Sequence, residues 1–213
     1  RELRIYGFSC VHFGDRKGHD AGLWEAFLRD VEQTDNALVI GIGDYLDWTR
    51  TTYRFALESV WGEDDKAAEE YDTMVMETFV YPFVDTIREH CPSFKDKCLG
   101  LIEGNHHAAM QSFRFRQSGR TSTEEICGLL GVPYLGLSAW LRLTVHQTRQ
   151  HGRHNLNIVV THSTSSSTNL PASLASATRS MSGLDGVDIF LTANDHALGQ
   201  ETKHLLACTQ RGA

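Results

Sequence analysis

The sequence predicts an α/β fold, in which apolar strand-type runs alternate with amphipathic helical stretches. Short unbroken apolar runs, such as residues 37–40 (Ala-Leu-Val-Ile), are typical of buried strands. Apolar residues at helical spacing in 23–31 lie between the first two of these runs. Ligand-type side chains directly follow five of the runs, which is where open α/β sheets bind their ligands.

The first part of the chain is predicted to contain three strands and three helices. The strands are residues 3–8, 37–40 and 97–102, and the helices are residues 23–31, 63–90 and 122–131. Pro82 is expected to break or kink the second helix, because proline lacks the backbone donor. Ser122 and Glu125 are the predicted capping box of the third helix, which should end at Gly131.

The second part of the chain is richer in predicted strands. These strands are residues 141–145, 156–160 and 187–191. The Ser/Thr run at 163–168 is interpreted as a loop, and Pro171 as the first residue of a helix that reaches Met181.

Composition restricts the classes of function. The chain has 213 residues, of which 41% are hydrophobic, so it can bury a sizeable core. A net charge of −7 argues against broad nucleic-acid binding, which needs a basic face. Five cysteines without a CxxC pair are typical of reduced thiols, so we expect a cytoplasmic protein. The sequence contains no apolar run of about 18 residues, so no membrane span is predicted. The oligomeric state cannot be read from the sequence.

Side chains that bind divalent metals follow five of the predicted strands. They are Cys10 and His12, Asp44, Asn105 and His106, His162, and Asn194 and His196. Each residue alone has an ordinary structural explanation, such as a turn, a helix cap or a surface histidine. The repetition of the pattern at successive strand ends favours a metal site.

The chemistry of such a site assigns further roles. Two divalent ions roughly 3.5–4 Å apart need a bridging carboxylate, and Asp44 is the natural bridge. His106, beside the predicted ligand Asn105, is the candidate acid that protonates the leaving oxygen, and Asp47 is the carboxylate that orients it. The residues therefore predict hydrolysis of a phosphate mono- or diester by metal-bound hydroxide.

These segments resemble the motifs of the calcineurin-like metallophosphoesterases: Val11-His12, Gly-Asp-Tyr-Leu-Asp at 43–47, Gly-Asn-His at 104–106, Thr-His at 161–162 and Asp-His at 195–196. The resemblance implies two mixed β-sheets packed as a sandwich and flanked by helices, in four layers. It implies one domain over residues 1–213, shortened at its C-terminal end. It also implies that one metal is held by residues 10, 12, 44 and 196, and the other by residues 44, 105, 162 and 194.

Two positions depart from the family pattern. Cys10 stands where the family has aspartate, and a thiolate ligand favours zinc or ferrous iron over manganese or magnesium. Asn194 stands where the family has histidine, and its neutral oxygen should weaken the second metal position. The expected cofactors are therefore two divalent ions (manganese, zinc or iron), the second bound more weakly. His107 and Arg114 are interpreted as substrate-binding residues, with exposure on a solvated loop as the alternative.

Two other functions compete with this hypothesis. The first is a catalytically degenerate relative that binds a protein partner or nucleic acid, which Cys10 and Asn194 favour. The second is a zinc hydrolase that acts on a substrate other than a phosphoester. The sequence contains no HExxH helix, GxSxG elbow, GxxxxGK[ST] loop or GxGxxG turn, so the common metalloprotease, serine hydrolase and nucleotide-binding motifs are missing.

Overall fold

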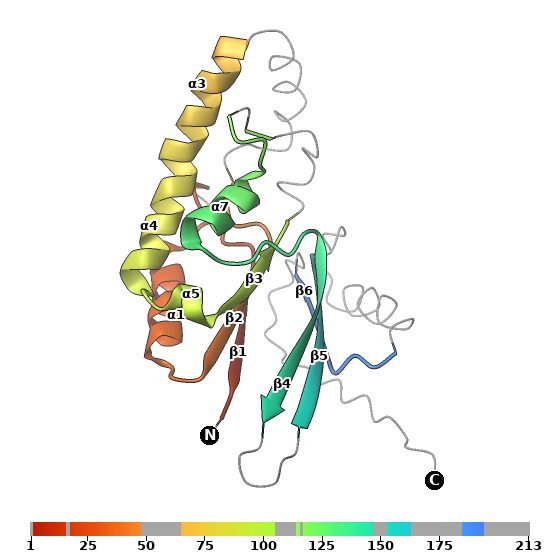
Figure 1. Cartoon of the computed structure of the whole chain (residues 1–213). Coiled ribbons are helices and arrows are strands. Elements are labelled where there is room, and N and C mark those ends of the chain that lie inside the picture. Colours follow the sequence, from red (N-terminus) through yellow and green to blue (C-terminus); the bar gives the residue numbers. More distant parts are fainter. Residues whose placement is uncertain are drawn as a thin grey trace. The chain divides into compact units, whose positions relative to one another are not determined.

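The computed structural model describes residues 2–15, 18–47, 65–104, 114–115, 117–146, 153–162 and 185–193. The described part of the chain has an α/β fold with two three-stranded sheets and helices, which confirms the α/β class, while the four-layered sandwich stays a prediction (Figure 1). It divides into two compact units, Arg1–Leu137 and Ser138–Ala213, and each unit carries one sheet. The predicted single domain over residues 1–213 stays a prediction. The predicted loop at 163–168 and the helix after Pro171 lie outside the described residues.

The first sheet contains strands β1 (Arg4–Phe8), β2 (Ala37–Ile42) and β3 (Cys98–Ile102) in the order β1-β2-β3. Both pairs of strands are parallel. The central strand β2 is apolar and almost wholly buried, as expected for a strand covered on both faces. Because the strands are parallel, their carboxyl ends meet at one edge of the sheet, and the loops after them lie together.

Helix α1 (Ala21–Gln33) connects β1 to β2. The Asp20 side chain caps its start by accepting a hydrogen bond from the Leu23 N–H at 3.0 Å. Three apolar side chains at helical spacing are buried, namely Trp24, Leu28 and Val31. The Trp24 ring stacks on the ring of Phe83 with a centroid separation of 5.7 Å, which packs α1 against helix α4 (Tyr81–His90).

The long helical segment between β2 and β3 stays helical through Pro82. It consists of α3 (Asp65–Val75), a π-helical turn η1 (Met76–Val80) and α4 (Tyr81–His90). Pro82 lies in the first turn of α4, where its missing N–H costs least. The predicted break is therefore a local widening of the helix, in which the Tyr81 N–H donates to the Met76 carbonyl. A short helix, α5 (Phe94–Lys97), precedes β3 and was not predicted.

Helix α7 (Ser122–Leu130) has its capping box one residue earlier than predicted. The box is formed by Thr121 and Glu124, not by Ser122 and Glu125: the Thr121 hydroxyl accepts from the Glu124 N–H at 3.2 Å. The Glu124 carboxylate in turn accepts from the Thr121 N–H at 2.7 Å. Thr121 has the extended backbone that a cap requires, whereas Ser122 is already helical. The helix ends at a left-handed Gly131, as predicted.

The second sheet contains β4 (Ser138–His146), β5 (Arg153–His162) and β6 (Ile189–Ala193) in the order β4-β5-β6. Strand β4 is antiparallel to β5, and β5 is parallel to β6. This sheet is mixed, as expected, whereas the described strands of the first sheet are all parallel. All three predicted strands are present, but β5 is longer than predicted and includes His162 as its last residue.

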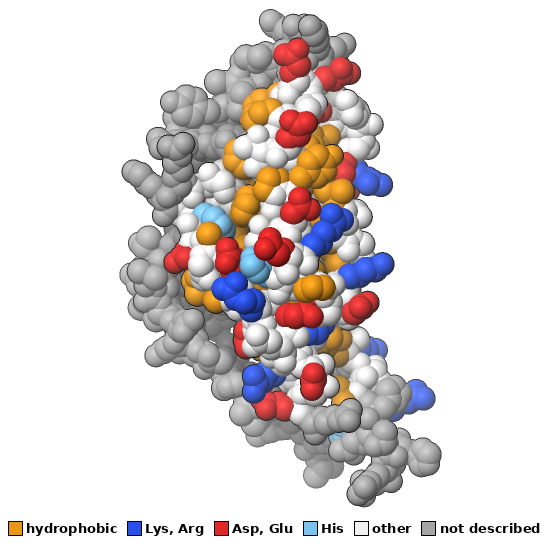
Figure 2. Space-filling view, turned by 90° about the vertical axis from the view of Figure 1, so that its left-hand side faces the viewer, with side chains coloured by type: hydrophobic (Ala, Val, Ile, Leu, Met, Phe, Trp, Pro, Cys, Tyr) orange, Lys and Arg blue, Asp and Glu red, His pale blue; other side chains and the backbone are white. Residues whose placement is uncertain are grey.

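The helical side of the first unit carries charges of both signs. In Figure 2, Lys and Arg side chains lie among Asp and Glu, and apolar side chains separate them. The described residues of this face therefore do not form the continuous basic surface that long nucleic acids need. None of the helices in the described part of the chain combines the length and apolarity that crossing a bilayer requires.

Two glycine-to-alanine substitutions should change stability in opposite directions. Gly131 has a φ of 68°, so alanine there must adopt a left-handed backbone and should lower the free energy of unfolding by about 1 kcal/mol. Gly22 lies inside α1, and a Cβ there would meet the Asp20 carboxylate at an ordinary 3.6 Å. Gly22→Ala should therefore raise that free energy by about 0.5–1 kcal/mol. Urea unfolding followed by circular dichroism measures both; changes of the same sign would contradict these helix assignments.

Candidate metal centre

The loops after β1 and β2 run side by side. The Cys10 N–H donates to the Gly43 carbonyl at 3.2 Å, and the His12 N–H donates to the Asp44 carbonyl at 3.2 Å. The Ser9 hydroxyl also donates to the Gly43 carbonyl at 3.2 Å. The parallel pairing of the two strands thus continues into their loops and brings residues about 33 positions apart in the sequence into register.

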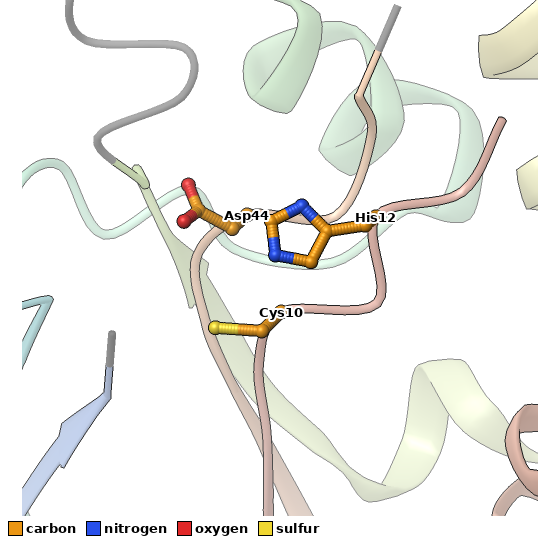
Figure 3. A group of neighbouring side chains, drawn as sticks. All are labelled: Cys10, His12 and Asp44. Atoms are coloured by element: carbon orange, nitrogen blue, oxygen red, sulfur yellow. The ribbon is translucent and has the colours of Figure 1, made fainter. Parts of the chain in front are cut away.

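Three of the predicted metal ligands meet in these loops: Cys10, His12 and Asp44. One ligand atom of each lies within 4.8 Å of the others, and Figure 3 shows the sulfur, the imidazole ring and the carboxylate gathered at one place. Asp44 is fully buried, His12 is 8% exposed and Cys10 is half-buried. A thiolate, an imidazole and a carboxylate are together a donor set that suits zinc and other borderline divalent ions. These residues therefore fit a metal ion by their chemistry.

The backbone is strained at the same three residues. Cys10, His12 and Asp44 have φ values of 52°, 48° and 55°, and they are the non-glycine residues with positive φ in the described part of the chain. A left-handed backbone costs a residue with a Cβ of the order of 1–2 kcal/mol. Such strain persists only where the surrounding structure enforces it, and it is concentrated at functional sites.

Gly104 closes the site from the side of β3. A Cβ at Gly104 would overlap the Asp44 Oδ1 and N atoms and would lie 2.9 Å from its Cγ. Only glycine allows this close approach of the two loops. The sequence motif Gly-Asn-His thus begins directly against the Asp44 carboxylate.

Tyr45 fixes the end of β2 to the end of β3. Its hydroxyl accepts from the Gly43 N–H at 3.0 Å and donates to the Ile102 carbonyl at 2.8 Å. The side chain is fully buried, and this burial raises the pKa of the phenol well above its usual value. Tyr45 therefore fastens the Asp44 loop to β3.

Asp47 contacts His12. Its Oδ2 lies 3.4 Å from His12 Nδ1. The Asp47 carboxylate accepts a hydrogen bond from the protonated imidazole, and this contact, reinforced by Cys10, raises the pKa of His12 to about 10. A carboxylate placed against a histidine ligand fixes the ring and increases its basicity. Asp47 was predicted to orient His106, which lies outside the described residues, so the structure assigns Asp47 to His12 and leaves the other contact as a prediction.

The surroundings of the Cys10 thiol favour its ionised form. Burial opposes ionisation, but hydrogen bonds with His12 and Ser9 outweigh it, so the pKa of Cys10 is lowered. The Ser9 hydroxyl lies 3.3 Å from its sulfur. An ionised thiol and a neutral imidazole are the ligand forms that a metal ion binds, and binding would therefore release the His12 proton.

The remaining predicted residues are distributed as follows. His162 is the last residue of β5 in the second unit and is 9% exposed. Arg114, predicted to bind substrate, contacts Glu124 at 3.2 Å and donates to the Gly119 carbonyl at 2.9 Å. Asn105, His106, His107, Asn194 and His196 lie outside the described residues. The structure thus brings together Cys10, His12, Asp44 and Asp47.

Glu103 is a buried acid that the sequence reading did not single out. It is 5% exposed, and burial raises the pKa of its carboxyl. The position of Glu103 in the sequence is the signal that could have identified it, because this acidic residue directly follows an apolar strand and precedes the Gly-Asn-His motif. Charged side chains are seldom fully buried unless their polar atoms have hydrogen-bond or ion-pair partners.

A separate cavity of about 370 Å³ lies beside the π-helical turn. Its described lining includes Asp72, Glu77 and Glu125 and none of the residues of the Cys10 cluster. Acidic walls repel a phosphate group, so this cavity does not fit the predicted substrate. We therefore place the candidate site at the strand ends.

No protein-family model, curated protein or solved structure matches the chain. The resemblance to the calcineurin-like metallophosphoesterases thus depends on the motif residues of the sequence.

Cys10 should be the most readily alkylated of the described cysteines. Burial raises the pKa values of Cys91, Cys98 and Cys127 to about 12, so these thiols stay protonated. Cys10 has a lowered pKa, so its thiolate persists to lower pH than that of an ordinary cysteine. Iodoacetamide labelling in the presence of a chelator, mapped by mass spectrometry across a pH series, measures each rate.

The same labelling series on the His12→Ala variant tests whether the imidazole lowers the pKa of Cys10. Loss of the imidazole should raise the pKa of Cys10 and move its labelling profile to higher pH. An unchanged profile, or equal labelling of the four described cysteines, would show that the loop does not activate this thiol.

Proposed function

We propose that this chain is a metal-dependent phosphoesterase that hydrolyses a phosphate mono- or diester at a site built around Asp44. The observation that supports the proposal is the convergence of Cys10, His12 and Asp44 at the ends of two neighbouring parallel strands. Two further facts add support: the strained backbone at these residues and the close contact of Gly104 with Asp44.

Cys10, His12 and Asp44 are the residues that would hold one divalent ion. Divalent ions bound to such donors activate water and neutralise the charge of a phosphoryl group. Asp44 is the proposed shared ligand of a second ion, since a carboxylate has two oxygens. Asn105, His162, Asn194 and His196 enter the proposal from the sequence, and Asn105 directly follows the glycine that contacts Asp44. Manganese, zinc and iron are the candidate metals.

The surrounding residues would keep the ligands in place. Asp47 holds the His12 ring, and the Tyr45 hydroxyl holds the Asp44 loop against β3. Because Asp44 is fully buried, its charge acts in a medium of low dielectric constant, where it attracts a cation more strongly than in water. His106 stays the proposed general acid on the basis of the sequence.

The finer expectations from the sequence belong to the same proposal. They are a sandwich of two sheets flanked by helices, a single domain over residues 1–213, a cytoplasmic location and a role for His107 and Arg114 in substrate binding. The Arg114 guanidinium is exposed and already paired with Glu124, so a phosphate would have to compete with that carboxylate.

Hydrolysis should depend on Asp44. With manganese or zinc, the protein should hydrolyse a generic aryl phosphodiester or monoester, and Asp44→Asn should lower kcat/KM by at least about 100-fold, because the shared ligand charge is lost. Asp85→Asn, which neutralises an exposed carboxylate on α4, is the matched control and should leave the rate unchanged.

Two results would count against the enzyme. The first is turnover by the wild type that does not exceed that of Asp44→Asn with any of the metals. The second is a metal content of one equivalent or none per chain, which would favour a degenerate relative that binds a partner. About two equivalents per chain supports the enzyme.

Cys10 should be visible in the spectrum of the cobalt-substituted protein. A thiolate bound to cobalt gives a charge-transfer absorption in the near ultraviolet, and carboxylate ligands do not. Cys10→Asp should abolish this absorption and shift the metal preference from zinc towards manganese, because a hard oxygen replaces a soft sulfur. Cys91→Ala removes a buried thiol elsewhere and should retain the absorption. Wild-type protein that binds cobalt without this absorption would remove Cys10 from the ligand set.

A further inference from the structure

The Glu103 carboxylate accepts three hydrogen bonds from neutral hydroxyl groups. Tyr134 donates to it at 2.8 Å, Thr123 at 3.0 Å and Thr121 at 3.2 Å. Among the described residues no cation contacts this carboxylate, and the three hydroxyl groups compensate for part of the water it has lost. Removing a carboxyl group from water is costly, and an apolar side chain would fill the same space at lower cost.

The three donors lie at the start of α7 and on the segment that follows this helix. Thr121 is the N-cap of α7, Thr123 lies in its first turn, and Tyr134 lies on the segment that follows the helix. Glu103 therefore ties both ends of this helical segment to the end of β3. The Glu103 backbone adds a fourth link, since its N–H donates to the Gly136 carbonyl at 2.8 Å.

Glu103 is also the residue next to Gly104. Gly104 contacts Asp44 through its backbone and has no side chain that could maintain the contact. The distance between the β3 end and Asp44 is therefore set by whatever holds the backbone at residues 103 and 104. Among the described residues, the four hydrogen bonds of Glu103 hold it there, together with the hydrogen bond from the Tyr45 hydroxyl to the Ile102 carbonyl.

We propose that Glu103 is a positioning residue of the candidate metal centre, and that its carboxylate keeps Gly104 against Asp44. Glu103 does not bind the metal or the substrate. It acts through Gly104, whose placement fixes the Asp44 carboxylate and the start of the Gly-Asn-His loop. This inference rests on the proposed function in one respect: its first test uses metal binding at the candidate site as the probe.

Metal affinity measures positioning without relying on hydrolysis. Glu103→Gln keeps the size of the side chain but replaces one acceptor oxygen by an amide group that cannot accept from a hydroxyl. Its affinity for zinc, measured by competition with a chromophoric chelator, should fall about tenfold or more, as for other residues that support metal ligands. Tyr134→Phe removes one donor at the rim of the network and should cause a smaller loss in the same direction.

A structural control separates positioning from general loss of stability. Ile126→Ala removes buried apolar contacts from the same helix, α7, and touches none of the Glu103 hydrogen bonds. It should lower stability while the zinc affinity of the folded protein stays at the wild-type value. Equal loss of affinity in Ile126→Ala and Glu103→Gln would overturn the inference, and so would wild-type affinity in both Glu103→Gln and Tyr134→Phe.

Hydrogen exchange tests the inference even if the wild-type protein binds no metal. That result would contradict the proposed function, but hydrogen exchange still reports on the contact between Gly104 and Asp44. In Glu103→Gln, or in Tyr134→Phe if that variant alone folds, peptides that contain residues 37–47 and 98–104 should exchange faster than in Ile126→Ala. Equal exchange in the Glu103 or Tyr134 variant and in the control would overturn the inference.

Discussion

The site depends on one buried carboxylate, that of Asp44, held at the end of β2 in a left-handed backbone. Three segments enclose it. The β1 loop hydrogen-bonds to its carbonyl through His12, the Tyr45 hydroxyl fastens its loop to β3, and Gly104 packs directly against its side chain. Burying an anion lowers the stability of the folded state unless a nearby positive charge compensates for it. A protonated His12 supplies such charge, and a bound divalent ion, which would replace that proton, would supply two positive charges.

Several features that oppose folding coincide at this place. Strained φ values, buried polar side chains and a glycine that cannot be replaced all lie in the loops after β1, β2 and β3. Elsewhere in the first unit local preference and tertiary structure agree: α1 buries one face, and α7 begins at a capping box and ends at a left-handed glycine. Departures from local preference that cluster in this way are expected at functional sites, because rigid surroundings maintain what the local sequence disfavours.

The polar groups around the cluster form two shells with different tasks. Cys10, His12 and Asp44 present donor atoms of three chemical types, and Asp47 and Ser9 adjust two of them by hydrogen bonding. Farther out, Glu103 and its three hydroxyl donors fix the backbone of β3 and contribute no donor to the cluster. This organisation explains why the described network is extensive although the cluster itself is small: precise placement of a few ligands requires support from several segments.

Apart from the short helix α5, the sequence by itself determined the order of the described strands and helices, and it indicated Cys10, His12 and Asp44 as neighbours, because hydrophobic periodicity and strand-end residues are local signals. It located the end of α7 at Gly131 but missed the cap by one residue, since Thr121 and Ser122 are both good caps and only the backbone selects one. Only the tertiary structure decided that Asp47 meets His12, that Glu103 is buried among hydroxyl groups, and that a π-helical turn accommodates Pro82. The reason is physical: the partners in these contacts are set by how distant segments pack, and that information is not carried by either residue alone.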